Sequence, residues 1–386
     1  MLISRASERR GARTRGIVGL ALLVLAAPAL RGAQPARPAK EPRSTAPRSL
    51  GASGEDFGPQ FLGTDGKGKV FLLRAATLEV FALDAAKGLV PAARLKRSPA
   101  LSAEPAHAAV MGRSSDDWWL LQGAGVWHTT SEGPQALPEV HWRVESLSRL
   151  GGGEPVVGVM PFGVGRPIGD RSFAAGDAAP LLLSFSGSAW RVLATEGEIP
   201  SSGAVNKEFA RINQERMVAL APGATKGLWV ADRYRFRVRK LSPAGKVLTS
   251  LKGSQEIRLE NDKDGKATQR KLVQMGDKAG GAIANLAVPA ILGLTEARDG
   301  NLYLVTNRNG IALERYDPVA EQVDRLKLQL GYSGRFTMAS GSDGLYLAGF
   351  GGQTGRWFLS WNTLAAADWR KVEDVEIGGP ASRAAQ

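Results

Sequence analysis

One unit recurs along this chain: a Gly-containing turn, an apolar and aromatic segment, and a second such segment shortly after it. The first segments are KVFLLR, DWWLLQ, APLLLS, GLWVAD, NLYLVT and GLYLAG, which begin at Lys69, Asp117, Ala179, Gly227, Asn301 and Gly344. Five of them are followed by a partner, namely VFALD, VWHTT, VRKLS, LERYD and WFLSW, which begin at Val80, Val126, Val238, Leu313 and Trp357. Turn pairs precede several segments, as at Asp65-Gly66, Asp299-Gly300 and Asp343-Gly344. A repeat of roughly 40 to 50 residues with several strands predicts the blades of a β-propeller.

The spacing of the first segments sets the expected number of blades. The steps of 64 residues from Trp118 to Leu182 and of 74 residues from Leu228 to Leu302 are too long for one blade. If both contain insertions the propeller has six blades, and hidden blades would raise the number to seven or eight. We favour an all-β chain with a single six-bladed propeller. LGGGEPVVGVMPFGVGRPIGD in the first step is interpreted as a connecting loop or a degenerate blade, and the second step predicts a projecting β-hairpin near residues 252–289.

The N-terminal residues predict export. Five Arg residues between Arg5 and Arg15 precede the apolar run from Ile17 to Leu30, in which Ala27 and Ala29 occupy the small-residue positions of a cleavage site. We therefore expect a signal peptide over residues 1–29 and a periplasmic or extracellular protein. An uncleaved anchor and a twin-arginine signal are the alternatives, and no second apolar stretch predicts a membrane span. The chain has no Cys, which excludes a lipid anchor on Cys and any disulfide.

Composition divides the rest of the chain. Residues 30–57 are rich in Pro, Ala and Arg and predict a disordered linker, followed by the propeller over residues 58–375 and a flexible tail over residues 376–386. Ten basic residues and two Glu in residues 1–48 contribute +8 of the net charge of +13, so the propeller is mildly basic and nucleic acid is not an expected partner. The best helical candidate is the short segment from Val205 to Val218.

Two segments resemble NHL-type repeats. They are LWVADRYRFRVRKLSPAGK, from Leu228 to Lys246, and VPAILGLTEARDGNLYLVTNRNGIALERYDP, from Val288 to Pro318. In this pattern an apolar strand ends in Ala-Asp, a polar turn follows, and Arg-Val opens the next strand. The resemblance implies a propeller without implying one function, because such propellers are binding scaffolds in some members and enzymes in others. Asn307 stands where the preceding unit has Asp232, so a ring of matching polar groups is incomplete.

The segment DRYRFRVRK carries the candidate ligand site. Arg233, Arg235, Arg237 and Arg239 alternate with Tyr234, Phe236 and Val238. On an extended strand this alternation places four guanidinium groups on one face, an arrangement suited to bidentate capture of phosphate, sulfate or carboxylate. The alternative is a solvated strand face whose charges pair with acidic neighbours.

Metal and catalytic signals are weak, and we expect no cofactor and no metal site. EIRLENDKDGK resembles the start of a calcium loop at Glu260, Asp262 and Asp264, but Lys271 stands where such loops need a bidentate carboxylate. The three His residues show no ligand spacing; they are His107, His128 and His141. Most of the Trp residues should pack between blades, and Trp119 is the one expected to be exposed because it alternates with Trp118.

The functional expectation is therefore a monomeric, exported binding or scaffold propeller that recognises a protein partner or an anionic glycan at one end of its channel. The alternative is an enzyme similar to the metal-dependent lactonase and lyase propellers, for which Asp232 and Asn307 would be two ligands. A third possibility is a periplasmic assembly subunit that docks through the insertion from Lys252 to Pro289.

Overall fold

The computed structural model describes thirteen stretches of the compact unit Pro42–Gln386. They are residues 45–50, 58–65, 67–97, 105–123, 125–151, 153–160, 167–199, 227–253, 258–259, 287–308, 310–330, 334–349 and 355–379. The expected signal peptide, the helical candidate at residues 205–218 and the candidate calcium loop at residues 260–271 lie outside these residues.

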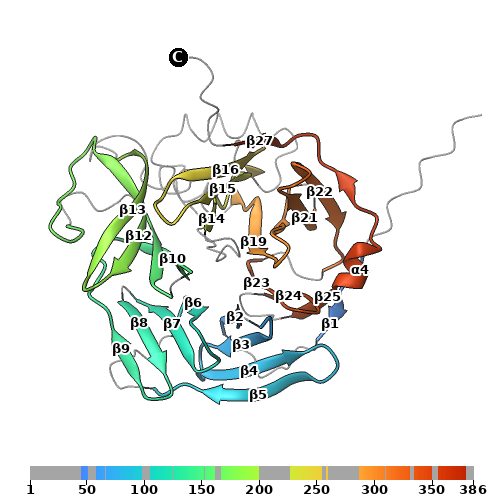
Figure 1. The fold of residues 1–386 in the computed structure, drawn as a ribbon, viewed down its shortest axis with the longest axis horizontal. Helices are drawn as coiled ribbons and strands as arrows, with labels where there is room; N and C mark the ends of the chain where they lie inside the picture. Colours follow the sequence, from blue (N-terminus) through green and yellow to red (C-terminus); the bar gives the residue numbers. More distant parts are fainter. Residues whose placement is uncertain are drawn as a thin grey trace, which may run out of the picture. The chain divides into compact units, whose positions relative to one another are not determined.

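Within this unit, six antiparallel sheets follow one another in chain order around a common centre (Figure 1). Blade 1 contains β2 (Gln60–Thr64), β3 (Val70–Arg74), β4 (Glu79–Asp84) and β5 (Gly88–Arg94). Blade 2 contains β6 (Ala108–Met111), β7 (Asp117–Gln122), β8 (Gly125–Thr130) and β9 (Pro134–Ala136). Blade 3 contains β10 (Val144–Arg149), β11 (Pro155–Val159), β12 (Ala178–Ser186) and β13 (Ala189–Glu198).

Blades 4 to 6 each include a strand from a distant part of the chain. Blade 4 contains β14 (Leu228–Ala231), β15 (Arg237–Leu241), β16 (Val247–Lys252) and β27 (Glu376–Gly378). Blade 5 contains β19 (Ile291–Glu296), β20 (Leu302–Thr306), β21 (Ala312–Asp317), β22 (Gln322–Lys327) and β26 (Arg370–Lys371). Blade 6 contains β23 (Phe336–Ser340), β24 (Gly344–Gly349), β25 (Arg356–Ser360) and β1 (Arg48–Ser49), and is followed by the helix α4 (Trp361–Ala365). The prediction of a six-bladed, all-β propeller is confirmed.

The ring is closed by apolar packing between every pair of neighbouring blades. Among the described residues six buried clusters lie at the six blade interfaces, and one of them joins blade 6 to blade 1. Leu72 packs toward blade 6 and Leu73 toward blade 2, because successive side chains of a strand point to opposite faces. Both faces of a blade are thus buried, which explains why strands such as VFLLR are almost continuously apolar.

The expected hairpins form, and their reference residues are buried. The five predicted pairs are β3–β4, β7–β8, β14–β15, β20–β21 and β24–β25, all antiparallel. Leu228, Leu302 and Leu345 have no exposed surface and lie in three different interface clusters. The prediction that these three residues face the inter-blade core is confirmed.

The first long sequence step has a simple cause. Leu182 lies on β12, the third strand of blade 3, whereas the reference residues on β3, β7, β20 and β24 lie on second strands. Leu228 lies on β14, the first described strand of blade 4. The second strand of blade 3 is β11, with the sequence PVVGV. For residues 155–159 the interpretation as a connecting loop or an extra blade was wrong, because all five residues of β11 are buried within blade 3. Residues 161–166 of the same segment lie outside the described residues.

The second long step contains a short antiparallel ladder. Arg258 pairs with Val288 and Leu259 with Ala287, which defines β17 (Arg258–Leu259) and β18 (Ala287–Val288). Two ends of the predicted insertion are thus joined as in a hairpin, and residues 260–286 between them lie outside the described residues.

Residues outside the expected propeller boundaries also belong to blades. Arg48 pairs with Phe358 and Ser49 with Trp357, so part of the expected linker is the outer strand of blade 6. β27, in the expected flexible tail, pairs with β16. None of the helices in the described residues is long and apolar enough to cross a membrane.

Candidate functional site

A cavity of about 360 Å³ opens between blades 2 and 3. Its walls come from the β6–β7 loop, the β7–β8 hairpin, the β10–β11 turn and the β12–β13 turn. The lining residues are Gly112, Arg113, Asp117, Trp119, His128, Gly153, Glu154, Pro155, Phe185 and Gly187. Aromatic rings and charged groups of both signs therefore meet in one place.

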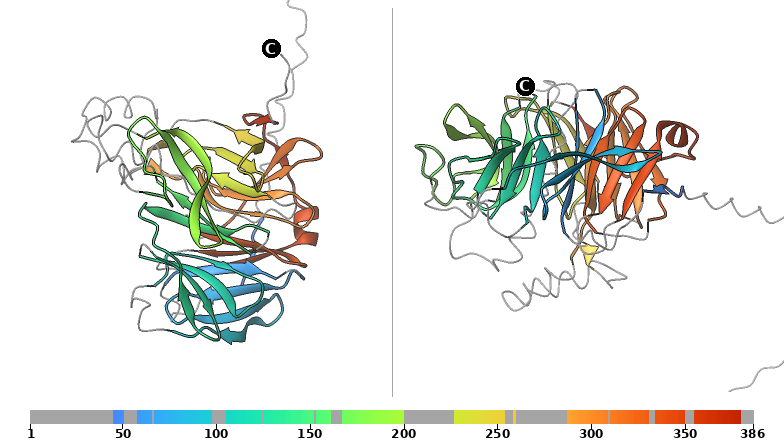
Figure 2. Two further views of the ribbon diagram at one scale, coloured as in Figure 1. Left: turned by 60° about the vertical axis from the view of Figure 1, so that its left-hand side comes forward. Right: turned by 90° about the horizontal axis from the view of Figure 1, so that it is seen from below.

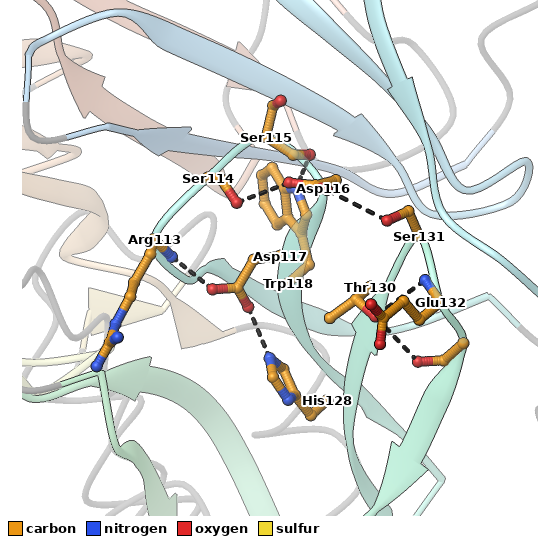
Figure 3. A network of polar contacts seen from close by, with 11 residues as sticks. Arg113, Ser114, Ser115, Asp116, Asp117, Trp118, His128, Thr130, Ser131 and Glu132 are labelled. Carbon is orange, nitrogen blue, oxygen red and sulfur yellow. Dashed lines mark hydrogen bonds and ion pairs between the residues drawn. The ribbon is translucent and has the colours of Figure 1, made fainter.

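A carboxylate and an imidazole form the polar centre of this cavity (Figure 3). Asp117 Oδ1 lies 2.7 Å from His128 Nε2, and Asp117 Oδ2 accepts a hydrogen bond of 2.7 Å from the backbone N–H of Arg113. A Cβ atom at residue 112 would lie 2.2 Å from the carboxylate, so Gly112 leaves the space that Asp117 occupies. Because a carboxylate only accepts hydrogen bonds, a neutral His128 carries its proton on Nε2 and presents Nδ1 as an acceptor.

The register of the β7–β8 hairpin brings these residues together. Trp119 is paired with His128, and Asp117 with Thr130, so Asp117 and His128 are diagonal neighbours on one face of the sheet. The Trp119 and His128 rings stack with centroids 4.1 Å apart and 17° between their planes. Trp118 points to the opposite face, where it is fully buried and donates from Nε1 to the Ser115 carbonyl at 2.9 Å. Trp119 is more exposed than Trp118, but it is partly buried against the cluster between blades 2 and 3, where the alternation predicted an exposed side chain.

Arginine residues surround the carboxylate. Arg113 is exposed at the rim of the cavity, and the partly buried Arg149 lies close enough to Asp117 and Arg113 to feel both charges. Burial lowers the pKa of Arg149, while the charge of Asp117 opposes this shift and that of Arg113 adds to it. The cavity thus combines flat aromatic surfaces and a fixed imidazole with the guanidinium group of Arg113 and the carboxylates of Asp117 and Glu154. The aromatic surfaces suit the ring faces of a ligand, and Arg113 is the lining group suited to a negative charge.

The four predicted arginines lie elsewhere and do not share one open face. Arg233 and Arg235 lie in the connection between β14 and β15, and only Arg237 and Arg239 belong to β15. Both strand residues contact Glu196 of blade 3: Arg237 is paired with its Oε1, and Arg239 Nη2 lies 2.7 Å from Oε2. Arg239 is buried. Arg237 and Arg239 thus pair with an acidic neighbour, as the alternative interpretation expected. Ligand binding by the four arginines stays a prediction.

Asp232 and Asn307 follow corresponding strands, β14 and β20, as the repeat predicted. The Asp232 carboxylate is buried and lies 4.0 Å from Arg237 and 3.9 Å from Arg239. Within the described residues no group of three or more His, Asp or Glu side chains is arranged to hold a metal ion. The positive charges of Arg237 and Arg239 pair with the Asp232 carboxylate and disfavour a divalent cation at the same place.

No protein-family model and no curated protein sequence matches this chain. Among solved structures it is similar to a streptogramin B lyase, at 11% identity and a TM-score of 0.45, over 80% of this chain and 96% of the lyase. It is also similar to regucalcin, a calcium-binding protein from Agrobacterium tumefaciens, at 12% identity and a TM-score of 0.44, over 82% of this chain and 95% of regucalcin. A third similar structure is a putative gluconolactonase, at 10% identity and a TM-score of 0.42, over 84% and 93% of the two chains. At these identities the likeness is one of fold.

Proposed function

We propose that this chain is an exported, NHL-like propeller that binds an anionic glycan in the cavity between blades 2 and 3. The observation that carries the proposal is the stacked Trp119–His128 pair, which faces a cavity that also contains Phe185 and Arg113. Sugar rings pack their apolar faces on aromatic side chains, and guanidinium groups bind carboxylate or sulfate substituents through paired hydrogen bonds. Asp117 keeps the imidazole in one plane, so the aromatic surface is formed before the ligand arrives.

The test compares Trp119→Ala with Trp127→Ala. Trp127 lies on the same hairpin but packs toward blade 1, so it controls for the loss of one indole. Binding of a heparin octasaccharide and of a polygalacturonate octasaccharide is measured by calorimetry at low and moderate salt. We expect Trp119→Ala to weaken binding about tenfold, as for the loss of one aromatic contact, and Trp127→Ala to bind as the unchanged protein does. Equal affinities of the unchanged protein and Trp119→Ala would refute the proposal, and binding to a protein partner alone would favour the scaffold alternative.

The metal-dependent enzyme is the second candidate, since propellers of similar fold include lyases. It rests on Asp232 and Asn307, and the arginines beside Asp232 weaken it. It predicts turnover of a lactone or glycan substrate that a chelator abolishes and that Asp232→Asn removes. Turnover that survives both treatments would exclude this pair as metal ligands.

A further inference from the structure

A second, larger cavity lies at the outer edge of the ring between blades 1 and 2. Its volume is about 610 Å³. The lining residues are Ala76, Thr77, Arg94, Leu95, Lys96, Arg97 and Ser131. Three cations and two hydroxyl groups thus line this groove, and its lining contains no carboxylate. We call it the rim groove.

The cations of the rim groove lack the acidic partners that other arginines of the propeller have. Arg94, Lys96 and Arg97 are exposed, and within the described ranges none of them forms an ion pair. Glu79 is the cross-strand neighbour of Arg94, but its carboxylate pairs with Arg74 at 3.9 Å. By contrast, Arg308 and Arg325 in blade 5 both contact Glu314. The positive charge of the rim groove is therefore available to a ligand.

Backbone contacts hold these cations in place. Leu95 is buried and donates its N–H to the Leu78 carbonyl at 2.9 Å, which fixes the segment between its two charged neighbours. Lys96 Nζ donates to the Glu132 carbonyl at 3.3 Å, and Arg97 Nη2 donates to the Ala76 carbonyl at 2.5 Å. Leu78 itself has a φ of 57°, a left-handed backbone conformation that is uncommon for a residue other than glycine. Backbone carbonyls, and not carboxylates, thus hold Lys96 and Arg97 in position. An anionic ligand would meet N–H donors that are already oriented.

One carboxylate lies next to the groove without being part of its lining, since it bonds to the hydroxyl of the lining residue Ser131. Asp116 accepts hydrogen bonds from Ser114 at 2.6 Å and from Ser131 at 3.3 Å (Figure 3). Asp116 is followed directly by Asp117 of the first cavity, and Ser131 follows β8, which carries His128. The β7–β8 hairpin and the residue that follows it therefore border both cavities.

We propose that the rim groove binds the sulfate or carboxylate groups of a polyanionic glycan whose sugar rings contact the Trp119 cavity. That the ligand is a glycan rests on the proposed function. That its anionic groups bind in the rim groove rests on the three cations that have no carboxylate partner among the described residues. Oxyanions bound by guanidinium and ammonium groups form charge-assisted hydrogen bonds, and Thr77 adds a hydroxyl group to the lining. The ligand class is thus narrowed to glycans that carry charge at intervals along the chain, such as sulfated or uronate polysaccharides.

The test replaces two cations that make no contact with a carboxylate. Arg94→Gln/Lys96→Gln is compared with Lys246→Gln/Arg370→Gln, which removes the same charge from exposed positions on blades 4 and 5. The probes are a heparin octasaccharide, a polygalacturonate octasaccharide, neutral maltooctaose and inorganic sulfate. We expect the rim-groove variant to bind one of the anionic octasaccharides at least about tenfold more weakly, from the loss of charge-assisted contacts. The control variant should lose less than about twofold, as for screened surface charge.

The outcomes separate this proposal from the previous one. Weaker binding in the rim-groove variant with unchanged binding in Trp119→Ala would support the rim groove as the anion site and refute the Trp119 cavity as the place where the sugar rings bind. The reverse pattern, or an equal loss in the control variant, would overturn the rim groove. A third outcome has two parts: inorganic sulfate raises the melting temperature of the unchanged protein but not of the rim-groove variant, and both proteins bind the octasaccharides equally. The groove would then bind a free anion, and the glycan would be refuted as its ligand.

Discussion

The indole Nε1 of Trp229 donates a hydrogen bond of 2.5 Å to Oε2 of Glu296, across the interface between blades 4 and 5. The Glu296 side chain has no exposed surface, and Lys240 Nζ lies 3.1 Å from the same oxygen. Lys240 also lies over the Trp229 ring, 5.3 Å from its centroid. The three side chains thus form a buried polar contact within an otherwise apolar interface.

We expect Lys240→Met to destabilise the protein by about 3 to 5 kcal/mol, because it leaves a buried carboxylate without its cation. The double variant Lys240→Met/Glu296→Gln should recover most of this loss, since a neutral amide oxygen can still accept from Trp229. The free energy of unfolding is measured in urea for the single and double variants. A double variant no more stable than Lys240→Met would show that the loss of the ion pair is not the cause of the destabilisation.

Two turn glycines provide a matched test of close backbone packing. Gly245 and Gly300 both have positive φ, 77° and 87°, and both donate to the carbonyl three residues earlier. A Cβ on Gly245 would lie 1.9 Å from the Leu193 carbonyl oxygen on β13, whereas nothing lies within 4 Å of one on Gly300. We expect Gly300→Ala to cost about 1 to 2 kcal/mol from backbone strain alone and Gly245→Ala to cost clearly more. Equal losses of stability of the two variants in thermal unfolding would mean that β13 shifts to make room for the added Cβ atom without a further loss of stability.

Alkaline pH should destabilise blade 5. Burial, together with the charge of Asp299, raises the pKa of Tyr303 from 10.0 to about 12. A phenol whose pKa is raised on folding stabilises the folded state fully below pH 10, and this contribution is lost as the pH rises through 12. We expect unfolding to become easier between these values, and Tyr303→Phe to lessen the pH dependence. Burial also raises the pKa of Tyr316 and of Tyr346, so the phenolate absorbance of Tyr303→Phe is subtracted from that of the unchanged protein to follow Tyr303 alone.

Removal of β1 should loosen blade 6. Leu50 donates its N–H to the Arg356 carbonyl at 2.8 Å, and Thr45 exchanges backbone hydrogen bonds with Lys327 and Gln329 in the segment that leaves blade 5. A chain that begins at residue 51 loses these bonds, each worth about 0.5 to 1.5 kcal/mol. We expect a lower melting temperature and faster amide exchange in β25 than in a chain that begins at residue 42. Unchanged exchange in β25 would show that β1 adds nothing to the closure of the ring.

Local patterns in the sequence predicted most of the fold. Hairpins such as β20–β21 were found because turn residues and apolar strands are adjacent in sequence. β11 was missed because PVVGV lies among glycines and no Asp-Gly turn marks its start, although it is as continuously apolar as VFLLR. β1 and β27 have two and three residues and no apolar pattern, and they are strands only because distant edges pair with them.

The candidate site was predictable in part. Gln122 pairs with Gly125, and counting outward from this turn places His128 opposite Trp119 and diagonal to Asp117. The sequence therefore contained the signal for the Asp117–His128 pair. This signal is the register of the hairpin, which a spacing typical of metal ligands does not reveal. The cavity depends on turns of blade 3, and the approach of Glu154 and Gly187 to blade 2 is set by the packing of one blade on another.

The added strands also fix the order in which the ring can be completed. Blades 1 to 3 use strands that are consecutive in sequence, whereas blade 6 needs residues 48–49 and blade 4 needs residues 376–378 (Figure 2). Pairing between distant segments carries a larger loop-closure entropy and forms later than local hairpins. During synthesis β1 therefore stays unpaired until β25 has been made, and a chain released before that point would expose the apolar face of blade 1 that packs against blade 6 in the closed ring.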